Sequence, residues 1–518
     1  MLDPRTPVLV GVGQVTNRPN PDQPAPTRPH PFALMADACR LAAADAAGSR
    51  GHRLLGRAGS LAMVGGLGWR LPNGPRWVAG ELGIDPADLA VSAIGGNMPL
   101  TLLHRAAGMI ALGELDVAVV CGAECFFTRR ALGAQQGLGA GGDLGEPAGW
   151  PSQDPDEIPT PHLVGTNRSP VTPAELACGV TLPVDAYPLL EHSLRAARGW
   201  SPADHRARMG TRWAGFSEVA AANPYAWLPE RHSPEQIVEP GPNNRMIALP
   251  YPKMCTANIF VDQSSALICC SVAAARDARV PEDRWIFPLG GAEAHDHWFL
   301  SERVALHSSP AMEIAGQRAL ALAGVGVDDL SAVDLYSCFP VVVEMATAAL
   351  GLDAAGSSPR PLTVTGGLTF FGGPGNNYVT HAVASLAERL RSTPSSVGLA
   401  SGLGWYATKH AFAVFASRPP AHAGAPFRCD DVQRDVDALP RQAVDDDATG
   451  AVTVETYTVV YDRQTRPHHG IAVCRTPGGT RTWAAVTHPD SLAAIAERDS
   501  DFVGTAGTLG ADRQLTFG

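Results

Sequence analysis

The stretch TVTGGLTFFGGPGNNYVTHAVASLAERLR, from Thr363 to Arg391, decides the fold. It begins as a glycine-rich loop and ends in a helical pattern over residues 381–390. The loop contains Gly372-Gly373-Pro374. Since Gly373 has no side chain, it can neither polarise a carbonyl group nor activate a nucleophile.

The chain of 518 residues is long enough for two or three domains and a large buried core. Hydrophobic residues make up 45% of it, which indicates a globular protein. The net charge of -11 argues against a general affinity for nucleic acid or for an anionic membrane. We therefore expect neither as a partner.

The N-terminus has no basic segment followed by an apolar stretch, and it runs almost directly into a strand over residues 7–12. No uninterrupted apolar run reaches the length that spans a membrane. Together these features favour a cytoplasmic protein. The ten cysteines include no C-x-x-C pair, which predicts free thiols in a reducing compartment.

Strand-like and helix-like segments alternate in two parts of the chain, which predicts βαβ units and a mostly parallel sheet. In the first part we expect strands over 8–12 and 115–121 and helices over 31–47 and 99–112. In the second part we expect helices over 264–276, 309–322 and 381–390 and strands over 285–289, 332–336, 397–400 and 411–416.

The segment between these two parts, residues 131–245, is rich in Gly, Pro and Trp and has several short helical stretches. We interpret it as a loop insertion between a first half, residues 1–130, and a second half, residues 246–418. Residues 419–426 have the composition of a linker. The period-two alternation that follows, beginning over 452–461, predicts a small β-barrel domain in residues 427–518.

Three segments, in this order, resemble the thiolase superfamily. ALGELDVAVVCGAEC (Ala111–Cys125) is similar to a thiolase helix that ends at Gly and leads through a strand into a Gly-x-Glu turn. MCTANIFVDQSSALICCSVAAA (Met254–Ala275) is similar to a later stretch that enters a helix, and Thr363–Arg391 resembles the last active-site loop. The β-rich extension identifies the chain as a member of the thiolase-like protein type 1 group, whose members often carry the label acetyl-CoA acetyltransferase.

This resemblance implies an α/β thiolase fold, with two related halves in α-β-α-β-α layers, followed by the added barrel. The resemblance also implies that the catalytic side chains of a thiolase are missing. A thiolase carries Gly-His-Pro where this chain has Gly373 in the middle position. The nucleophilic cysteine falls on Gly96, and the cysteine of the final Cys-x-Gly motif falls on Ala400. Condensation needs a thiolate and a base, so we expect no competent thiolase.

The motif that reads Asn-Glu-Ala-Phe or His-Asp-Cys-Phe in the superfamily falls on Tyr336-Ser337-Cys338-Phe339. Thiolase-like aldolases of steroid side-chain breakdown also place a tyrosine in this pocket. The candidates for chemistry are therefore Tyr336, Cys338 and His410. The alternatives are a tyrosine that fills lost volume, a buried small residue and a satisfied core histidine. The remaining predicted pocket residues are Gly96, Asn97, Ser337, Gly373, Asn376 and Asn377.

Two other patterns have simpler interpretations than a metal or dinucleotide site. Glu293-Ala294-His295-Asp296-His297 offers metal ligands, but no third segment with matching ligands is apparent, so a solvated loop is favoured and no metal is predicted. Gly137–Gly142 matches G-x-G-x-x-G without following a strand or opening a helix, so it does not predict a dinucleotide site. No resident cofactor is expected.

Three classes of function remain open. The first is a protein that binds an acyl-CoA, or another pantetheine-linked thioester, without turnover. The second is an acyltransferase or retro-aldolase of non-covalent mechanism that uses Tyr336, Cys338 or His410. The third is a scaffold whose C-terminal domain recruits a partner enzyme. Thiolases usually form dimers, and the extra domain leaves both dimer and monomer open.

Overall fold

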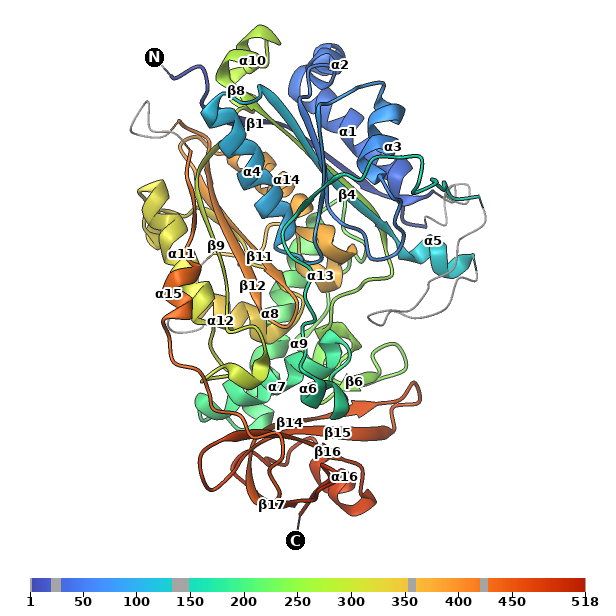
Figure 1. The fold of residues 1–518 in the computed structure, drawn as a ribbon, viewed down its shortest axis with the longest axis vertical. Coiled ribbons are helices and arrows are strands. Elements are labelled where there is room, and N and C mark those ends of the chain that lie inside the picture. The colour runs from blue at the N-terminus through green and yellow to red at the C-terminus, as the bar shows by residue number, and fades with distance from the viewer. Residues whose placement is uncertain (1, 20–28, 133–148, 353–359, 420–426, 518) are drawn as a thin grey trace.

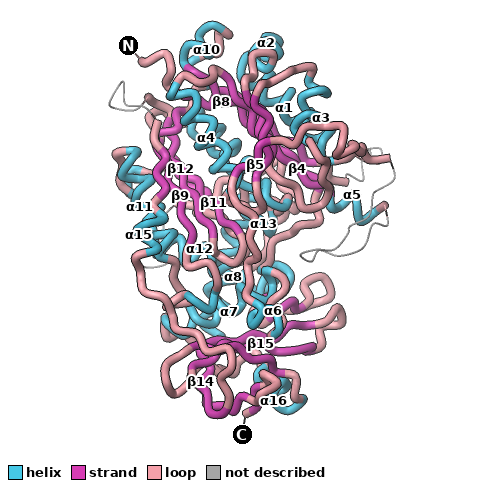
Figure 2. Tube along the Cα trace, in the orientation of Figure 1, coloured by secondary structure: helices cyan, strands magenta, loops and turns pink. Residues whose placement is uncertain are grey.

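The computed structural model describes residues 2–19, 29–132, 149–352, 360–419 and 427–517 (Figure 1). The Gly137–Gly142 stretch and all but the first residue of the predicted linker lie outside these ranges. Two sheets and the helices that cover them form the larger part of the molecule, and a further sheet lies at the C-terminal end (Figure 2).

The first sheet runs in the order β1-β8-β4-β2-β3-β5. Its strands are β1 (Pro7–Thr16), β8 (Asp262–Ser271), β4 (Val117–Cys125), β2 (Ser60–Met63), β3 (Asp88–Ser92) and β5 (His162–Val164). The strands β4, β2, β3 and β5 are parallel, whereas β8 is antiparallel to both β1 and β4. Because β1 and β4 are both antiparallel to β8, they run in the same direction, so the sheet is mostly parallel, as expected, with β8 as its reversed strand.

Strand β8 corrects a prediction, because a helix was expected over residues 264–276. Only α10 (Val272–Asp277), at the end of that range, is helical. Every residue of β8 is buried, and its small Ser, Ala and Cys side chains pack between layers on both faces of the sheet. A strand buried on both faces has no polar alternation, so its sequence does not distinguish it from a buried helix.

The second sheet runs in the order β10-β11-β12-β9-β13. Its strands are β10 (Ala332–Asp334), β11 (Val397–Gly404), β12 (Lys409–Ala416), β9 (Phe287–His295) and β13 (Cys429–Asp431). The strand predicted over 285–289 thus continues to His295, so most of the Glu293–His297 stretch belongs to a strand and not to a loop.

Helices complete the layers. Helices α4 (Met98–Leu112) and α14 (Tyr378–Arg391) lie between the two sheets and contact both (Figure 1). The outer face of the first sheet is covered by α1 (Pro31–Ala47), α2 (Gly51–Leu55) and α3 (Gly74–Leu82), and that of the second by α11 (Pro310–Ala323) and α12 (Pro340–Leu350). The α-β-α-β-α order of a thiolase fold is confirmed.

The central segment of the chain contains α5 (Phe126–Ala131), α6 (Pro173–Ala177), α7 (Pro183–Ala197), α8 (Pro202–Ala222) and α9 (Pro234–Val238). Proline stands at the first turn of α6 to α9, where its missing N–H costs no hydrogen bond. Helix α7 packs against both α12 and the C-terminal sheet. This segment therefore connects the sheets of the larger part to the C-terminal domain.

The C-terminal sheet contains β14 (Gly450–Tyr461), β15 (Pro467–Arg475), β16 (Arg481–Val486), β17 (Ala506–Leu509) and β18 (Leu515–Thr516), joined by β6 (Met246–Ala248) and β7 (Tyr251–Pro252). A bridge between Ala485 and Gln514 brings its two ends together, as in a barrel. The described part of this region also has α15 (Gln433–Asp437) and α16 (Pro489–Ile495), so it is not purely β. No helix within the described ranges has the length and apolar character to cross a membrane.

Candidate functional site

The candidate site lies at the N-terminal end of α4, where Gly96 meets Tyr336 from the loop after β10. A Cβ atom built on Gly96 would lie 2.3 Å from Tyr336 Oη and 2.6 Å from the carbonyl oxygen of Leu403. The phenol therefore occupies the volume that a side chain at Gly96 would need. These two predicted residues are in contact.

Tyr336 presents a protonated hydroxyl at this point. Burial raises the pKa of the phenol well above its usual value, so it stays neutral at physiological pH. Its backbone N–H donates to Ser401 Oγ at 2.9 Å, and its ring packs edge-on against Tyr378. Within the described residues the hydroxyl itself makes no hydrogen bond, although the side chain is only slightly exposed. It is an unused hydrogen-bond donor.

Two asparagines belong to the same cluster. Asn376 bridges two loops, because its Oδ1 accepts from the N–H of Gly95 at 3.0 Å and its Nδ2 donates to Gly65 O at 2.6 Å. Asn97 caps the start of α4 and is buried, and its Oδ1 has no hydrogen-bond partner in the described structure. The site thus holds an unpaired acceptor as well as an unpaired donor.

Lys409 is a site residue that the sequence prediction missed. It is the first residue of β12, and its Nζ donates to Ile94 O at 2.6 Å and to Thr166 O at 3.4 Å. Its side chain also touches the position of a Cβ atom on Gly95. Desolvation lowers the pKa of this amine to about 8. A lysine at the start of a strand that is apolar beyond His410 was the signal in the sequence.

The neighbouring residue His410 faces away from Gly96. Successive side chains of a strand point to opposite faces, so Lys409 and His410 cannot both reach the site. His410 Nε2 lies 3.2 Å from Asp296 Oδ2 and 3.2 Å from Ser309 Oγ, in a buried cluster at the start of α11. This placement matches the alternative of a satisfied core histidine.

Cys338 and Ser337 follow Tyr336 but are not poised for catalysis. Burial raises the pKa of the Cys338 thiol to about 12, so almost none of it is the nucleophilic thiolate at neutral pH. Ser337 is fully buried, and its Oγ accepts from the N–H of Leu368 at 3.3 Å. Both residues support the loop that carries Tyr336.

The two remaining predicted residues lie on the far side of the glycine-rich loop. Asn377 donates through Nδ2 to Gly122 O at 2.7 Å. Gly373 donates its N–H to Asn258 O at 2.8 Å, and a Cβ atom built on it would be in ordinary contact, at 3.5 Å, with Ala257. The structure brings neither residue into contact with Gly96.

Comparisons with known proteins show the family and the fold of the chain. The family profile for the thiolase-like protein type 1 additional C-terminal domain matches residues 431–514. The crystal structure of a monomeric SCP2-thiolase like protein type 1 from Mycobacterium smegmatis has 33% sequence identity to this chain, with 100% of both chains covered and a TM-score of 0.82. The chain belongs to the thiolase-like protein type 1 family.

More distant structures share only the fold. The Ltp2-ChsH2(DUF35) aldolase has 20% identity and a TM-score of 0.56, over 80% of this chain and 99% of that chain. The dimeric peroxisomal thiolase of Saccharomyces cerevisiae has 13% identity and a TM-score of 0.53, over 81% and 99% of the two chains. A comparison with curated proteins found no match.

Glu124, which ends the Gly-x-Glu turn of this thiolase-like protein, is buried behind the same loops. Its carboxyl group accepts hydrogen bonds from the N–H groups of Leu67 and Gly68, the latter at 3.0 Å. Burial raises the pKa of Glu124 to about 7. A Cβ atom on Gly375 would lie 2.6 Å from the carboxyl group. Glycine at position 375 therefore allows the loop to close over a carboxyl group that titrates near neutrality.

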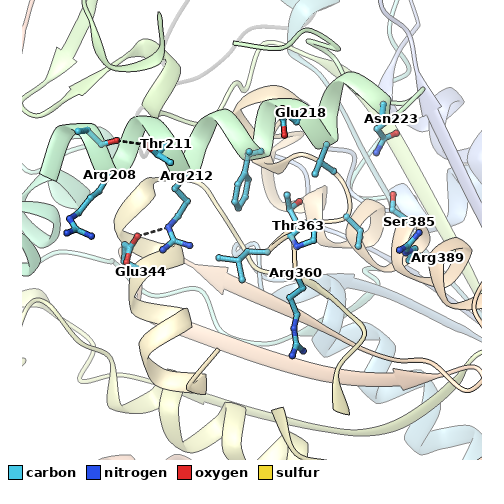
Figure 3. A pocket seen from close by; sticks show the side chains of 18 of the residues that line it. Arg208, Thr211, Arg212, Glu218, Asn223, Glu344, Arg360, Thr363, Ser385 and Arg389 are labelled. Carbon is cyan, nitrogen blue, oxygen red and sulfur yellow. Dashed lines mark hydrogen bonds and ion pairs between the residues drawn. The ribbon is translucent and has the colours of Figure 1, made fainter. Parts of the chain in front are cut away.

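A cavity of about 1270 Å³ lies beside the site in this thiolase-like protein, between α8, α12, α14 and residues 360–364 (Figure 3). None of its lining residues is a predicted site residue. Phe216 lines the cavity and also packs against Gly367. A Cβ atom built on Gly367 would lie 2.5 Å from the Phe216 ring and 2.7 Å from Ser337 Oγ. The cavity thus backs onto the loop that carries Tyr336.

Proposed function

We propose that this thiolase-like protein binds an acyl thioester of CoA, or of another pantetheine-linked carrier, beside Gly96 and Tyr336 without forming an acyl-enzyme. The observation that carries the proposal is the protonated phenol of Tyr336, which lies against Gly96 and has no hydrogen-bond partner among the residues that the structure describes. A thioester carbonyl oxygen is a suitable acceptor for such a donor.

The surroundings support binding of a carbonyl group. The N–H groups of the first turn of α4 already donate to the carbonyl oxygens of Gly95 and Asn97, but the positive end of the helix dipole still favours a partly negative oxygen. Covalent transfer needs a thiolate, and Gly96 supplies no sulfur while the Cys338 thiol stays protonated. The cavity of about 1270 Å³ offers room for a large ligand, and Arg208 and Arg389 on its wall suit phosphate groups.

Titration calorimetry with acetyl-CoA tests the proposal. We expect wild-type protein to bind and Tyr336→Phe to weaken binding by roughly 2- to 12-fold, the equivalent of one neutral hydrogen bond. The matched control is Tyr457→Phe, which removes the hydroxyl of another buried tyrosine, in the C-terminal sheet. No binding by wild-type protein, or equal binding by wild type and Tyr336→Phe, contradicts the proposal.

The same phenol favours a second candidate, a retro-aldolase or non-covalent acyltransferase. A neutral buried phenol can donate a proton to an oxygen that becomes negative during bond cleavage. The distinguishing assay is cleavage of a β-hydroxyacyl-CoA. Turnover that Tyr336→Phe abolishes would favour the aldolase; binding without turnover favours the first proposal.

A role as a scaffold, with a partner enzyme held by residues 427–518, stays a prediction. The solved Ltp2-ChsH2(DUF35) aldolase is named as an assembly of two components. Co-purification of a partner that depends on the C-terminal domain, with no stabilisation by acyl-CoA, would support the scaffold. The cytoplasmic location expected from the sequence likewise stays a prediction.

A further inference from the structure

Three potential metal ligands from distant parts of the chain converge at one edge of the second sheet. They are His104 on α4, Glu293 on β9 and Cys429 on β13. His104 Nδ1 lies 2.6 Å from Glu293 Oε1 and 3.2 Å from Cys429 Sγ, and Sγ lies 3.9 Å from Oε1. The cluster lies at the β9–β13 edge of the second sheet, whereas Tyr336 follows β10 at the opposite edge, so the cluster is independent of the proposed function.

The arrangement differs from a catalytic relay. In a relay of cysteine, histidine and carboxylate, the thiol and the carboxylate bind opposite nitrogens of the imidazole. Here both groups lie on the same nitrogen, Nδ1, and Nε2 has no hydrogen-bond partner in the described structure. Three donor atoms that face one another around a common point are instead the arrangement of a metal site.

Neighbouring residues hold these ligands in place. A Cβ atom on Gly291 would lie 2.3 Å from His104 Nε2, so glycine at this position allows the ring to lie flat against β9 with Nδ1 toward the cluster. Thr101, one helical turn before His104, donates through Oγ1 to Glu293 Oε2 at 2.8 Å. Such hydrogen bonds to the second oxygen orient carboxylate ligands in metal sites.

We propose that His104, Glu293 and Cys429 bind a Zn²⁺ ion, with water as the fourth ligand. Nitrogen, oxygen and sulfur together suit zinc among the common divalent metals. Tetrahedral zinc with usual bond lengths places its ligand atoms about 3.4 to 3.6 Å apart. The observed separations of 2.6, 3.2 and 3.9 Å need only small side-chain movements to reach these values. Glu293 and Cys429 are partly exposed, which leaves access for ion and water.

The ion would fasten β13 to the larger part of the molecule. In sequence, β13 is the first strand after residues 420–426, and it pairs in parallel with β9, with Asp431 beside Glu293. A metal bond from Cys429 to His104 would connect this strand to α4 across the edge of the sheet. The Glu293–His297 stretch thus contributes one ligand, and the two partners that the sequence did not reveal come from α4 and β13.

Cobalt substitution tests the proposal on full-length protein that has been reduced and treated with a chelator. We expect one equivalent of Co²⁺ to give the strong visible bands of tetrahedral cobalt together with a near-ultraviolet thiolate charge-transfer band, both displaced by Zn²⁺. Cys429→Ser should remove the charge-transfer band. Thr101→Val leaves all three ligands in place and should weaken Zn²⁺ binding by about 10- to 100-fold.

The matched control is His468→Gln. His468, which is exposed, and His469, which is half-buried, form an imidazole pair with their Nδ1 atoms 2.8 Å apart, where adventitious metal would bind. This variant should keep the spectrum and stoichiometry of the wild type. Should Cys429→Ser fail to fold, Glu293→Gln replaces it, and its Zn²⁺ affinity should fall at least about 100-fold. Absence of the charge-transfer band in wild type, or metal binding lost in His468→Gln and kept in Cys429→Ser, overturns the proposal.

Discussion

Gly96 and Tyr336 share one small volume at the centre of the molecule, and this pair defines the chemistry of the site. The Tyr336 hydroxyl lies where any side chain at position 96 would begin. A cysteine introduced at Gly96 would therefore meet the phenol and the Leu403 carbonyl before it reached a ligand. We therefore expect that a cysteine at position 96 would not by itself give thiolase activity.

Gly96→Ala should lower the free energy of unfolding by about 1 to 3 kcal/mol, because the added methyl group overpacks the site. In a double-mutant cycle, Gly96→Ala should cost less in a Tyr336→Ala background than in the wild type, since one of the two clashes is then absent. The control is Gly108→Ala on the same helix, where no atom lies near the added methyl group and a gain in stability is expected. Urea unfolding measures the stability of these variants. An unchanged free energy of unfolding for Gly96→Ala would show that Gly96 and Tyr336 do not share this volume.

Lys409 should make stability depend on pH. Its pKa falls from 10.5 to about 8 in the folded protein, so between these values the unfolded chain holds a proton that the folded protein has released. Stability therefore rises as pH increases from 8 to 10.5, by about 3 kcal/mol in all, and is unaffected by this group below pH 8. In urea unfolding, the free energy of unfolding of the wild type should rise relative to that of Lys409→Met between pH 8 and 10.5. A constant difference between the two proteins over this range would contradict the prediction.

At the scale of elements, the predictions succeeded where a pattern was local. Helix α1 has the predicted bounds because proline at its start and an alanine-rich buried face are both visible in the sequence. Helix α4 matches the predicted range of 99–112 to within one residue and ends at Gly113. Strand β8 was missed because its identity depends on the strands that flank it. The site shows the same division: Tyr336 was found from its motif, whereas the contacts of Lys409 exist only in three dimensions.

One buried arginine contributes to the attachment of the C-terminal sheet. Arg481 on β16 is fully buried, pairs with Glu455 through Nε at 2.8 Å and donates to the carbonyl oxygens of Leu300 and Ser301. Arg481→Leu should cost about 3 kcal/mol of stability, at the lower end for a broken buried pair because Arg475 still pairs with Glu455.

Thermal and urea unfolding measure the Arg481→Leu change. The matched control is Arg466→Ala, which breaks an ion pair to Asp462 on the surface and should cost less than about 1 kcal/mol. Equal effects of the two substitutions would show that Arg481 does not anchor the C-terminal sheet.

At the scale of the whole molecule, the short strand β5 forms one edge of the first sheet. It pairs in parallel with β3 and so covers the edge that β3 would otherwise present to a second copy. The new edge is only three residues long, which gives little backbone for pairing. We expect a monomer, with a mass of 54.2 kDa by light scattering after gel filtration. A stable species of twice that mass would contradict this.

The central claim is that the molecule keeps the thiolase fold and binds a thioester without covalent transfer. Intact-protein mass spectrometry during incubation with saturating acetoacetyl-CoA tests it most directly. Since the resemblance assigns the two cysteine positions of a thiolase to Gly96 and Ala400, and burial raises the pKa of Cys338 to about 12, we predict no acyl adduct and no release of acetyl-CoA when CoA is added. A protein mass increased by one acetyl group, mapped to Cys338 and turned over by added CoA, would contradict the account.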